Sequence, residues 1–581
     1  MKKALAVLLT ALMLVVVSPM ARALDVTTGP ASMARFFDAR TSIFVSIRID
    51  DGYLDALSSV VNRIGEKIPP GIVPSGLLPL DLRAQLDSQL ALANISLADI
   101  RGAVGDHFAV GVNDIEAFIA SSQRSGSPEG FFFALAMRDR AALMRLIASN
   151  IGQIPMEESF GFTILRPNSD TVIAIGDEVI YIAPSGVTLP LGTRMATLLS
   201  TSGFQESAAA MPAESYNIYM YVAYADLLSA AVAISGDMGF SPELMELLPS
   251  SLAIGATILD DSVLTIDVVT DQLIEGVLTT PVTPAFGAFI PNGVDLLLWG
   301  ADLNGYVNYV LDILPDSLSA GTTTTPEEAA AQIEQALTSF TQATGINLRE
   351  DVLSWMTGDF AIYSTLDLEP LTRFIVAGAS GTRAPNLPEF PVEFGVVIAT
   401  DNPAKTAETV TKLTTLVRAA VANASQLRVN DVNENGFTGI ELIVTVPLEG
   451  PSRTTSIDIL LGSTNEIFFF GTTKTAQGLL AGQNVLNDPV FSRALTYAPP
   501  NLVQFAYTDG EGFAGLLGLP IGAALALSGG NPSASEAQAA QAVATMLQVV
   551  EFLNRVVDHS IIASGYAANG YVVARATIAL R

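Results

Sequence analysis

The chain has 581 residues, of which half are hydrophobic and 15% are charged, with no cysteine, two histidines and a formal net charge of -29. This length predicts more than one domain, and the positive mean hydropathy excludes a disordered acidic polymer. The missing cysteines exclude disulfides, zinc ribbons and iron–sulfur clusters. The excess of acid argues against nucleic acid as a partner, because phosphate binding needs a basic surface.

The first residues have the pattern of a secretory signal peptide. Lys2 and Lys3 precede an apolar run, 4–17, and Ala21-Arg22-Ala23 fits the small-x-small rule for cleavage before Leu24. The alternative is a leader that is kept as an anchor helix, for which the apolar run is short. We expect residues 1–23 to be removed and the mature protein to be secreted or periplasmic, outside the cytoplasmic membrane.

No later segment predicts a membrane span. The run 218–234 comes closest, but Asp226 lies in its middle. Strands alternate with helical patterns along the whole chain, whereas an outer-membrane barrel would carry many alternating strands and few helices.

Six segments repeat one local pattern, in which an apolar strand ends in aspartate and a helix-like spacing follows. An aspartate at this position can accept hydrogen bonds from the free N–H groups of the first helical turn. We therefore interpret these aspartates as helix N-caps, with a catalytic or metal-binding cluster as the alternative. The predicted caps are Asp51, Asp139, Asp226, Asp302, Asp401 and Asp509.

The order of elements predicts a tandem duplication, with one copy at 24–283 and the second at 284–581. Residues 93–110 resemble 344–362, each segment follows a helical pattern, and each half ends in a predicted hairpin. Because helices and tight hairpins occur together, we expect an α+β fold whose antiparallel or mixed sheets are covered by helices.

The segment 431–436, Asp-Val-Asn-Glu-Asn-Gly, matches the opening of a calcium loop, with Asp431, Asn433 and Asn435 as candidate ligands. Glu441 stands one position too early to close such a loop, and the flanks predict strands. The alternative is a hairpin that turns at Asn435-Gly436. We expect no other cofactor or metal.

Three further motifs are interpreted structurally. The glycines of 510–515 match G-x-G-x-x-G, but Glu511 would place a carboxylate beside a bound pyrophosphate. Residues 471–475, Gly-Thr-Thr-Lys-Thr, are too short for a phosphate-binding loop. The pairs Asp106-His107 and Asp558-His559 are adjacent on predicted strands, so we expect their side chains to point to opposite faces and not to interact.

The chain also resembles an uncharacterised bacterial family of secreted proteins, catalogued as domain of unknown function 3352. The resemblance is carried by SIFVSIRIDD (42–51), GDHFAV (105–110) and DVLSWMTGDFAIY (351–363). It implies a secreted α+β protein and transfers no catalytic residue.

These observations favour a non-enzymatic binding or structural protein of the cell envelope, whose ligand would be apolar or a lipid. The first alternative is a carboxylate-dependent extracellular hydrolase acting on glycans, for which no motif selects a pair of acids. The second alternative is a partner in an envelope or secretion assembly. No residue is predicted to be catalytic or to bind a cofactor.

Overall fold

The computed structural model describes residues 24–68, 79–92, 94–122, 129–150, 155–192, 196–235, 249–260, 262–271, 280–319, 325–373, 391–422, 424, 426–447, 454–499, 501–518 and 536–581. The predicted signal peptide lies outside these residues. Helices and antiparallel strands together make the fold α+β, as expected. In the described ranges no helix is long and apolar enough to cross a membrane.

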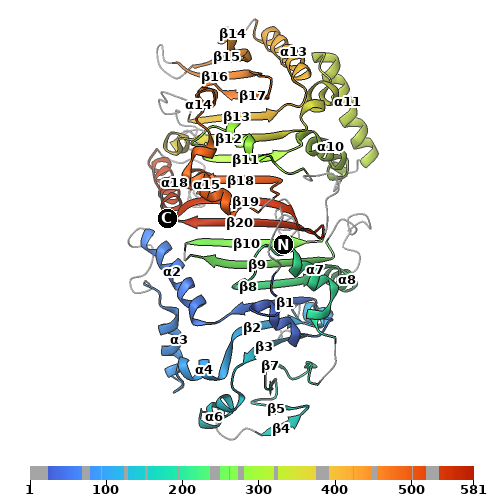
Figure 1. The fold of residues 1–581 in the computed structure, drawn as a ribbon, viewed down its shortest axis with the longest axis vertical. Coiled ribbons are helices and arrows are strands. Elements are labelled where there is room, and N and C mark those ends of the chain that lie inside the picture. The colour runs from blue at the N-terminus through green and yellow to red at the C-terminus, as the bar shows by residue number, and fades with distance from the viewer. Residues whose placement is uncertain are drawn as a thin grey trace. The chain divides into compact units, whose positions relative to one another are not determined.

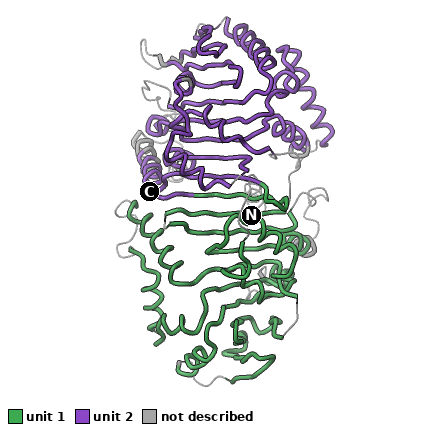
Figure 2. The backbone as a smooth tube through the Cα atoms, in the orientation of Figure 1, with its two compact units in different colours: residues 1–274, 566–577 green, residues 275–565, 578–581 purple. Residues whose placement is uncertain are grey.

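The chain divides into two compact units (Figure 2). Unit 1 comprises residues 1–274 together with 566–577, and unit 2 comprises residues 275–565 together with 578–581. The boundary between the units, at 274/275, therefore lies nine residues before the predicted boundary between the two copies, at 283/284. The C-terminal segment 566–577, which was assigned to the second copy, belongs to the first unit.

In the described part of unit 1 a 3-10 helix comes first, and strands alternate with helices except in two runs of consecutive strands, at 156–184 and 251–270 (Figure 1). Its elements are η1 (Pro30–Phe36), β1 (Ile43–Arg48), α2 (Asp51–Lys67), α3 (Leu82–Ala91), α4 (Leu97–Ala103), β2 (Val104–Val112), α5 (Ile115–Ser122), β3 (Phe131–Met137), α6 (Arg140–Asn150), β4 (Met156–Ser159), β5 (Phe162–Leu165), β6 (Thr171–Ile175), β7 (Val179–Pro184), η2 (Leu198–Ser200), α7 (Ser202–Ala210), β8 (Ile218–Ala223), α8 (Tyr224–Ser235), β9 (Ser251–Leu259) and β10 (Val263–Thr270). The final strand β20 (Val572–Leu580) contributes its residues up to Thr577.

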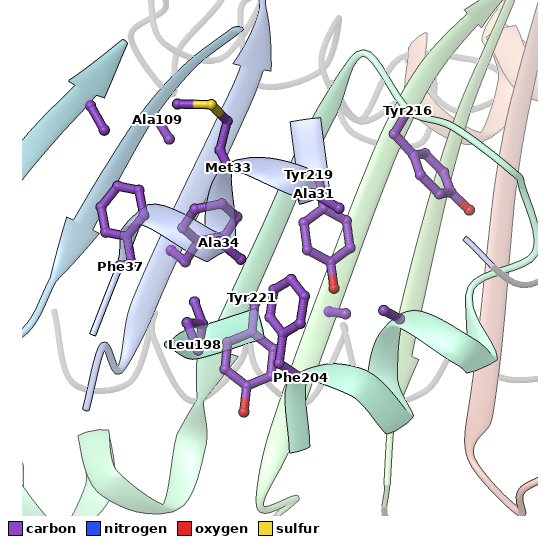
Figure 3. Close-up of a cluster of buried hydrophobic side chains, with 14 of the residues drawn as sticks. Ala31, Met33, Ala34, Phe37, Ala109, Leu198, Phe204, Tyr216, Tyr219 and Tyr221 are labelled. Atoms are coloured by element: carbon purple, nitrogen blue, oxygen red, sulfur yellow. The ribbon is translucent and has the colours of Figure 1, made fainter. Parts of the chain in front are cut away.

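The strands of unit 1 form one antiparallel sheet in the order β4-β5-β6-β7-β3-β2-β1-β8-β9-β10. Side chains alternate between its two faces. The face that carries Phe44, Phe132 and Tyr219 packs on η1, η2 and α7 and forms the main core. We call this the first face. Figure 3 shows part of this core, with Tyr219 and Tyr221 beside Phe204 of α7. Phe44 lies edge-on to Phe37 of the loop after η1 and to Phe204 of α7, with ring centroids 5.1 and 6.0 Å away.

Unit 2 repeats this alternation of strands and helices. Its elements are η3 (Pro284–Phe289), β11 (Leu296–Ala301), α10 (Leu303–Ser319), α11 (Pro326–Thr344), η4 (Leu348–Val352), η5 (Leu353–Trp355), β12 (Asp359–Leu366), β13 (Val392–Ala399), α13 (Pro403–Val421), β14 (Leu427–Glu434), β15 (Phe437–Pro447), β16 (Thr454–Ser463), β17 (Ile467–Thr472), α14 (Thr473–Leu480), η6 (Val485–Asn487), α15 (Pro489–Tyr497), β18 (Gln504–Asp509), α16 (Gly510–Phe513), η7 (Ala514–Gly518), α18 (Glu536–Val556) and β19 (Val557–Tyr566).

Local sequence explains several helix ends in unit 2. Thr325 and Glu328 form a capping box at the start of α11, where Pro326 loses no hydrogen bond. Gly345 ends that helix in the left-handed conformation, with φ of 72°, which glycine adopts without steric cost.

The strand order of unit 2 is β14-β15-β16-β17-β13-β12-β11-β18-β19, again antiparallel throughout. Nine strands of unit 1, from β4 to β9 in the sheet, follow the same order. This shared topology is what a duplicated module would show, and duplication of the sequence stays a prediction. On the first face of this sheet Trp299, Tyr363 and Phe505 are almost fully buried.

A buried ion pair holds the C-terminal segment in unit 1. Asp267 of β10 has no exposed surface, and its two carboxylate oxygens accept from Nε and a terminal nitrogen of Arg575 at 2.7 and 3.0 Å. The Tyr216 hydroxyl donates to the same carboxylate at 2.6 Å. Burial and the neighbouring carboxylate raise the pKa of Tyr216, so its hydroxyl remains a donor.

Candidate functional site

The second face of the unit 1 sheet carries a continuous row of apolar side chains, one from each of eight neighbouring strands. We call it the middle row of unit 1. The residues stand opposite one another in register across the sheet. They are Ile173, Ile182, Phe133, Val110, Val45, Met220, Ile254 and Val268.

This row departs from the usual pattern of an antiparallel sheet. Such sheets commonly pack one face on the core and turn polar side chains to water on the other. Here the first face is the core, yet the second face is also apolar, and every side chain of the middle row is half-buried. Ile266, in the next row along β10, is 48% exposed. A contiguous apolar surface that reaches solvent is a candidate binding surface.

Helices flank the middle row of unit 1 on the same face. Phe118 of α5 contacts Phe131 at the edge of the face, with ring centroids 6.3 Å apart, and α5 packs against α8. At the β5–β7 end, Leu143 and Ile147 of α6 lie in a cluster with Leu135 and Ile180. Ile173 and Ile182 of the middle row pack against this same cluster, so α6 covers that end of the row.

Unit 2 carries the equivalent row on the equivalent strands. Its members are Leu461, Phe470, Val396, Ile362, Leu298, Ala506 and Ile562, again opposite one another in register. Three of them are exposed: Ile362 by 44%, Ile562 by 40% and Phe470 by 38%. Leu461 is only 8% exposed and lies in a core cluster, against which Val396 packs. We call this row the middle row of unit 2. Neither middle row contains a charged or hydrogen-bonding side chain.

At one end of the unit 2 sheet, two carboxyl groups are neighbours. Asp295 precedes β11 and Asp509 ends β18, and the backbone N–H of Asp509 donates to the carbonyl oxygen of Asp295 at 3.1 Å. The N–H of Leu366 donates to Asp295 at 2.5 Å, and the N–H of Gly512 donates to Asp509 at 2.7 Å. We call Asp295 and Asp509 the acid pair. It connects β11, the end of β12 and the start of α16.

Burial of the acid pair raises the pKa of both carboxyl groups, and that of Asp295 reaches about 7. The charges of Asp509 and Glu511 raise the pKa of Asp295 further, whereas the Leu366 N–H lowers it. Two carboxylates in contact cannot both ionise easily, so the pair shares one proton below neutral pH.

Comparison with known families matches the chain to a protein of unknown function (DUF3352) over residues 195–511, which is more than half of its length. The chain belongs to the DUF3352 family. No curated protein and no solved structure matches it. The family match includes the acid pair and most of the unit 2 middle row, and it begins in unit 1 before β8.

Three of the six predicted cap aspartates accept hydrogen bonds from a first-turn N–H group. Asp139 accepts from Ala142, Asp302 from Gly305 and Asp509 from Gly512, at 3.0, 2.9 and 2.7 Å. Asp509 is also a member of the acid pair.

At the other three positions the predicted aspartate stands one to three residues from the cap position. The cap of α2 is Asp50, and Asp51 is its first helical residue. Asn402 caps α13, while Asp401 accepts from the Thr357 hydroxyl. Asp226 lies inside the first turn of α8. Neighbouring polar side chains compete for the same N–H groups, and sequence spacing alone does not decide between them.

The predicted calcium segment is a hairpin between β14 and β15 in the structure. Asn435 and Gly436 form its turn, with φ of 52° and 81°. Asp431 makes an ion pair with Arg418. Within the residues that the structure describes, no three His, Asp or Glu side chains converge to hold a metal ion. Calcium binding by Asp431, Asn433 and Asn435 stays a prediction.

The G-x-G-x-x-G segment owes its glycines to packing. A Cβ atom on Gly512 would lie 1.9 Å from the carbonyl oxygen of Asp295, and one on Gly510 would lie 2.6 Å from the carbonyl oxygen of Val557. The glycines thus allow α16 to approach β11 and β19. Gly471 is likewise required inside β17, where a Cβ would lie 2.5 Å from the Phe394 carbonyl oxygen.

The prediction that Asp558 and His559 do not interact is wrong. His559 Nδ1 lies 2.9 Å from Asp558 Oδ2, because alternation constrains the Cβ atoms and not the carboxylate two bonds beyond. The ring is fully buried between Tyr497 and Tyr507. Burial lowers the pKa of His559, which favours a neutral ring packed in the core. His107 is half-buried on β2, and burial lowers its pKa as well.

Proposed function

We propose that this DUF3352 protein is a non-enzymatic binding protein of the extracytoplasmic space that holds the acyl chain of a lipid. The observation that carries the proposal is the pair of equivalent middle rows on the second faces of both sheets. These apolar side chains stand in register and are partly exposed. The free energy is lowered when an apolar ligand displaces water from them.

The dimensions of the rows suit an acyl chain. Strands in a sheet lie about 4.8 Å apart, so the part of the unit 2 row from Phe470 to Ile562, which covers six strands, extends over roughly 24 Å. One acyl chain occupies about half of a 30 Å bilayer core, or roughly 15 Å. The rows contain no polar groups, which fits a ligand portion that makes no hydrogen bonds, such as a hydrocarbon chain.

The charge of the chain favours a single lipid molecule over a bilayer surface. A formal charge of -29 repels anionic membranes, which attract basic segments. We therefore propose that a lipid leaves its bilayer to bind here.

The acid pair gives limited support to the hydrolase alternative. Glycosidase carboxyl groups lie about 5 Å or more apart, so that a sugar or water fits between them. Asp295 and Asp509 stand side by side on neighbouring strands, and each carboxyl group accepts from a backbone N–H group. This contact suits a structural role. The binding experiment below distinguishes the assembly-partner alternative from lipid binding.

A charged substitution in the middle row tests the proposal. Ile362→Glu should weaken binding of a fluorescent C18 fatty acid at least tenfold, because the ligand would have to desolvate a carboxylate. The fold should tolerate this change, since Ile362 is already 44% exposed.

Phe340→Glu is the matched control, since Phe340 is 43% exposed in the same unit but lies on α11. It should bind the fatty acid as the unaltered chain does. Equal binding by both variants would contradict the proposal. If the unaltered chain binds an envelope protein but no fatty acid, and Ile362→Glu loses that protein, the assembly-partner alternative is favoured instead.

A further inference from the structure

The second face of unit 2 carries hydroxyl groups beside its middle row. Thr508 of β18 stands directly opposite Ser560 of β19, and their hydroxyl oxygens are 2.8 Å apart. We call these two residues the hydroxyl pair. Each lies two residues from a middle-row member of its strand, Ala506 or Ile562, and so points to the same face. Both are partly exposed. Two residues along a strand span about 7 Å, so the hydroxyl pair borders the apolar row.

Unit 1 has apolar side chains at the equivalent positions. In the matching register Val222 of β8 stands opposite Leu252 of β9, and the middle-row residue two positions before Val222 is Met220. Unit 2 therefore has hydroxyl groups where unit 1 has valine and leucine, and it has the smaller Ala506 where unit 1 has methionine. This place is polar and roomier in unit 2, although the strands around it are equivalent.

The hydroxyl pair lies toward one end of the unit 2 middle row. From Ala506 of β18 the row continues over β11, β12 and β13 to Phe470 of β17. Four strand spacings of about 4.8 Å give roughly 19 Å, which accommodates the roughly 15 Å of one acyl chain. A lipid whose head group lies at the hydroxyl pair can therefore place its whole chain on the row.

The chemistry of the hydroxyl pair suits an uncharged polar head group. Within the pair one hydroxyl donates to the other, which leaves one O–H donor and free lone pairs for a ligand. An ester carbonyl can accept from this O–H, and a hydroxyl of the ligand can donate to a lone pair. A head group that combines an ester with hydroxyl groups satisfies both partners.

Acidic side chains at the same end of the sheet disfavour an anionic head group. Asp509 ends β18, Glu511 lies in α16 after it, and the Asp509 N–H donates to the carbonyl oxygen of Asp295 before β11. Arg581 approaches this place, since a Cβ on Gly510 would lie 2.6 Å from its guanidinium. Because the acidic groups outnumber this arginine, a carboxylate or phosphate head group would meet net repulsion. An uncharged head group would not.

We propose that the hydroxyl pair selects the head group of the unit 2 ligand, which is an uncharged lipid of the monoacylglycerol class. Its chain lies on the middle row, and its ester and hydroxyl groups bind Thr508 and Ser560. Unit 1, with hydrocarbon at the equivalent positions, makes no such selection. The inference rests on the proposed function, since it takes the middle row as the surface that holds the acyl chain.

Quenching of tryptophan fluorescence by brominated lipids measures binding to unit 2 of the full chain, because both tryptophans lie in that unit. At pH 8.5, where a fatty acid is ionised, a brominated monoacylglycerol should bind roughly tenfold more tightly than the fatty acid with the same chain. Thr508→Val, which introduces the valine of unit 1, should weaken monoacylglycerol binding roughly five- to tenfold and leave fatty-acid binding unchanged. Ser560→Ala is a second variant with the same expectation.

Thr365→Val is the matched control. Thr365 is also half-buried in the unit 2 sheet, but it stands on the first face, because it is an odd number of residues from Ile362. This change should leave the binding of both lipids unaltered. Equal binding of the two lipids by the unaltered chain, or an unchanged ratio in both Thr508→Val and Ser560→Ala, would overturn the head-group inference alone. Binding of neither lipid would overturn the proposed function and the inference with it.

Discussion

Replacing Asp267 with alanine should destabilise unit 1 by about 3–5 kcal/mol, because it leaves the guanidinium of Arg575 buried without its carboxylate. Asp267 has no exposed surface and accepts from both Arg575 and Tyr216. The pair also joins β10 to a segment about 300 residues later in the chain. Urea unfolding, followed by hydrogen exchange of β9 and β10 peptides, measures the loss.

Two variants separate burial from charge in this prediction. Asp431→Ala removes a carboxylate that is also paired with arginine but whose side chain is 85% exposed, and it should change stability by less than about 0.5 kcal/mol. The double change Asp267→Leu and Arg575→Met should cost less than Asp267→Ala, since no buried charge remains. A loss below 1 kcal/mol for Asp267→Ala would refute the assigned role.

Asp295→Asn should stabilise unit 2 at pH 8 by about 2 kcal/mol and flatten its dependence on pH. The raised pKa of Asp295 means that the folded state holds a proton that the unfolded chain releases near pH 4. This contribution to stability is fully present below pH 4 and is lost as pH rises through about 7. The shift corresponds to about 4 kcal/mol, which we halve because the pair is only half-buried.

Tryptophan fluorescence isolates this effect in unit 2. The chain has two tryptophans, Trp299 and Trp355, and both are buried in that unit. The urea midpoint of the unaltered chain should be lower at pH 8 than at pH 5, while that of Asp295→Asn should be the same at both pH values. A parallel fall in both proteins would show that other groups carry the dependence.

Local pattern predicted the secondary structure of the chain well. Each of the six strand–aspartate segments contains a strand. Apolar β-branched and aromatic runs identify strands, and polar residues at their ends identify helix starts. The hairpin turn at Asn435-Gly436 follows from the same local chemistry.

The middle rows were missed, although the sequence contained a signal for them. Strand segments such as Phe131–Met137 and Leu296–Ala301 are apolar at successive positions and do not alternate with polar residues. Such runs indicate a sheet that is covered on both faces. The register that aligns the two rows depends on pairings between distant strands, which periodicity within one strand does not provide.

The acid pair and the buried ion pair could not be predicted for the same reason. Asp295 and Asp509 are more than 200 residues apart, and neither stands in a motif that specifies the other. Asp509 was predicted as a helix cap, and it is one, but its second partner depends on how β11 and β18 lie side by side. Sequence spacing constrains neighbours along the chain and leaves such contacts open.

Native mass spectrometry of the purified full chain, combined with solvent extraction of the same sample, tests the central claim most directly. We expect added masses of acyl lipids, up to two per chain, and further binding when stearic acid is supplied to stripped protein. Ile362→Glu should lose the unit 2 ligand, and Phe340→Glu should keep it. A chain that carries no lipid and binds no stearic acid at pH 5.5 or 8.5 would contradict the account.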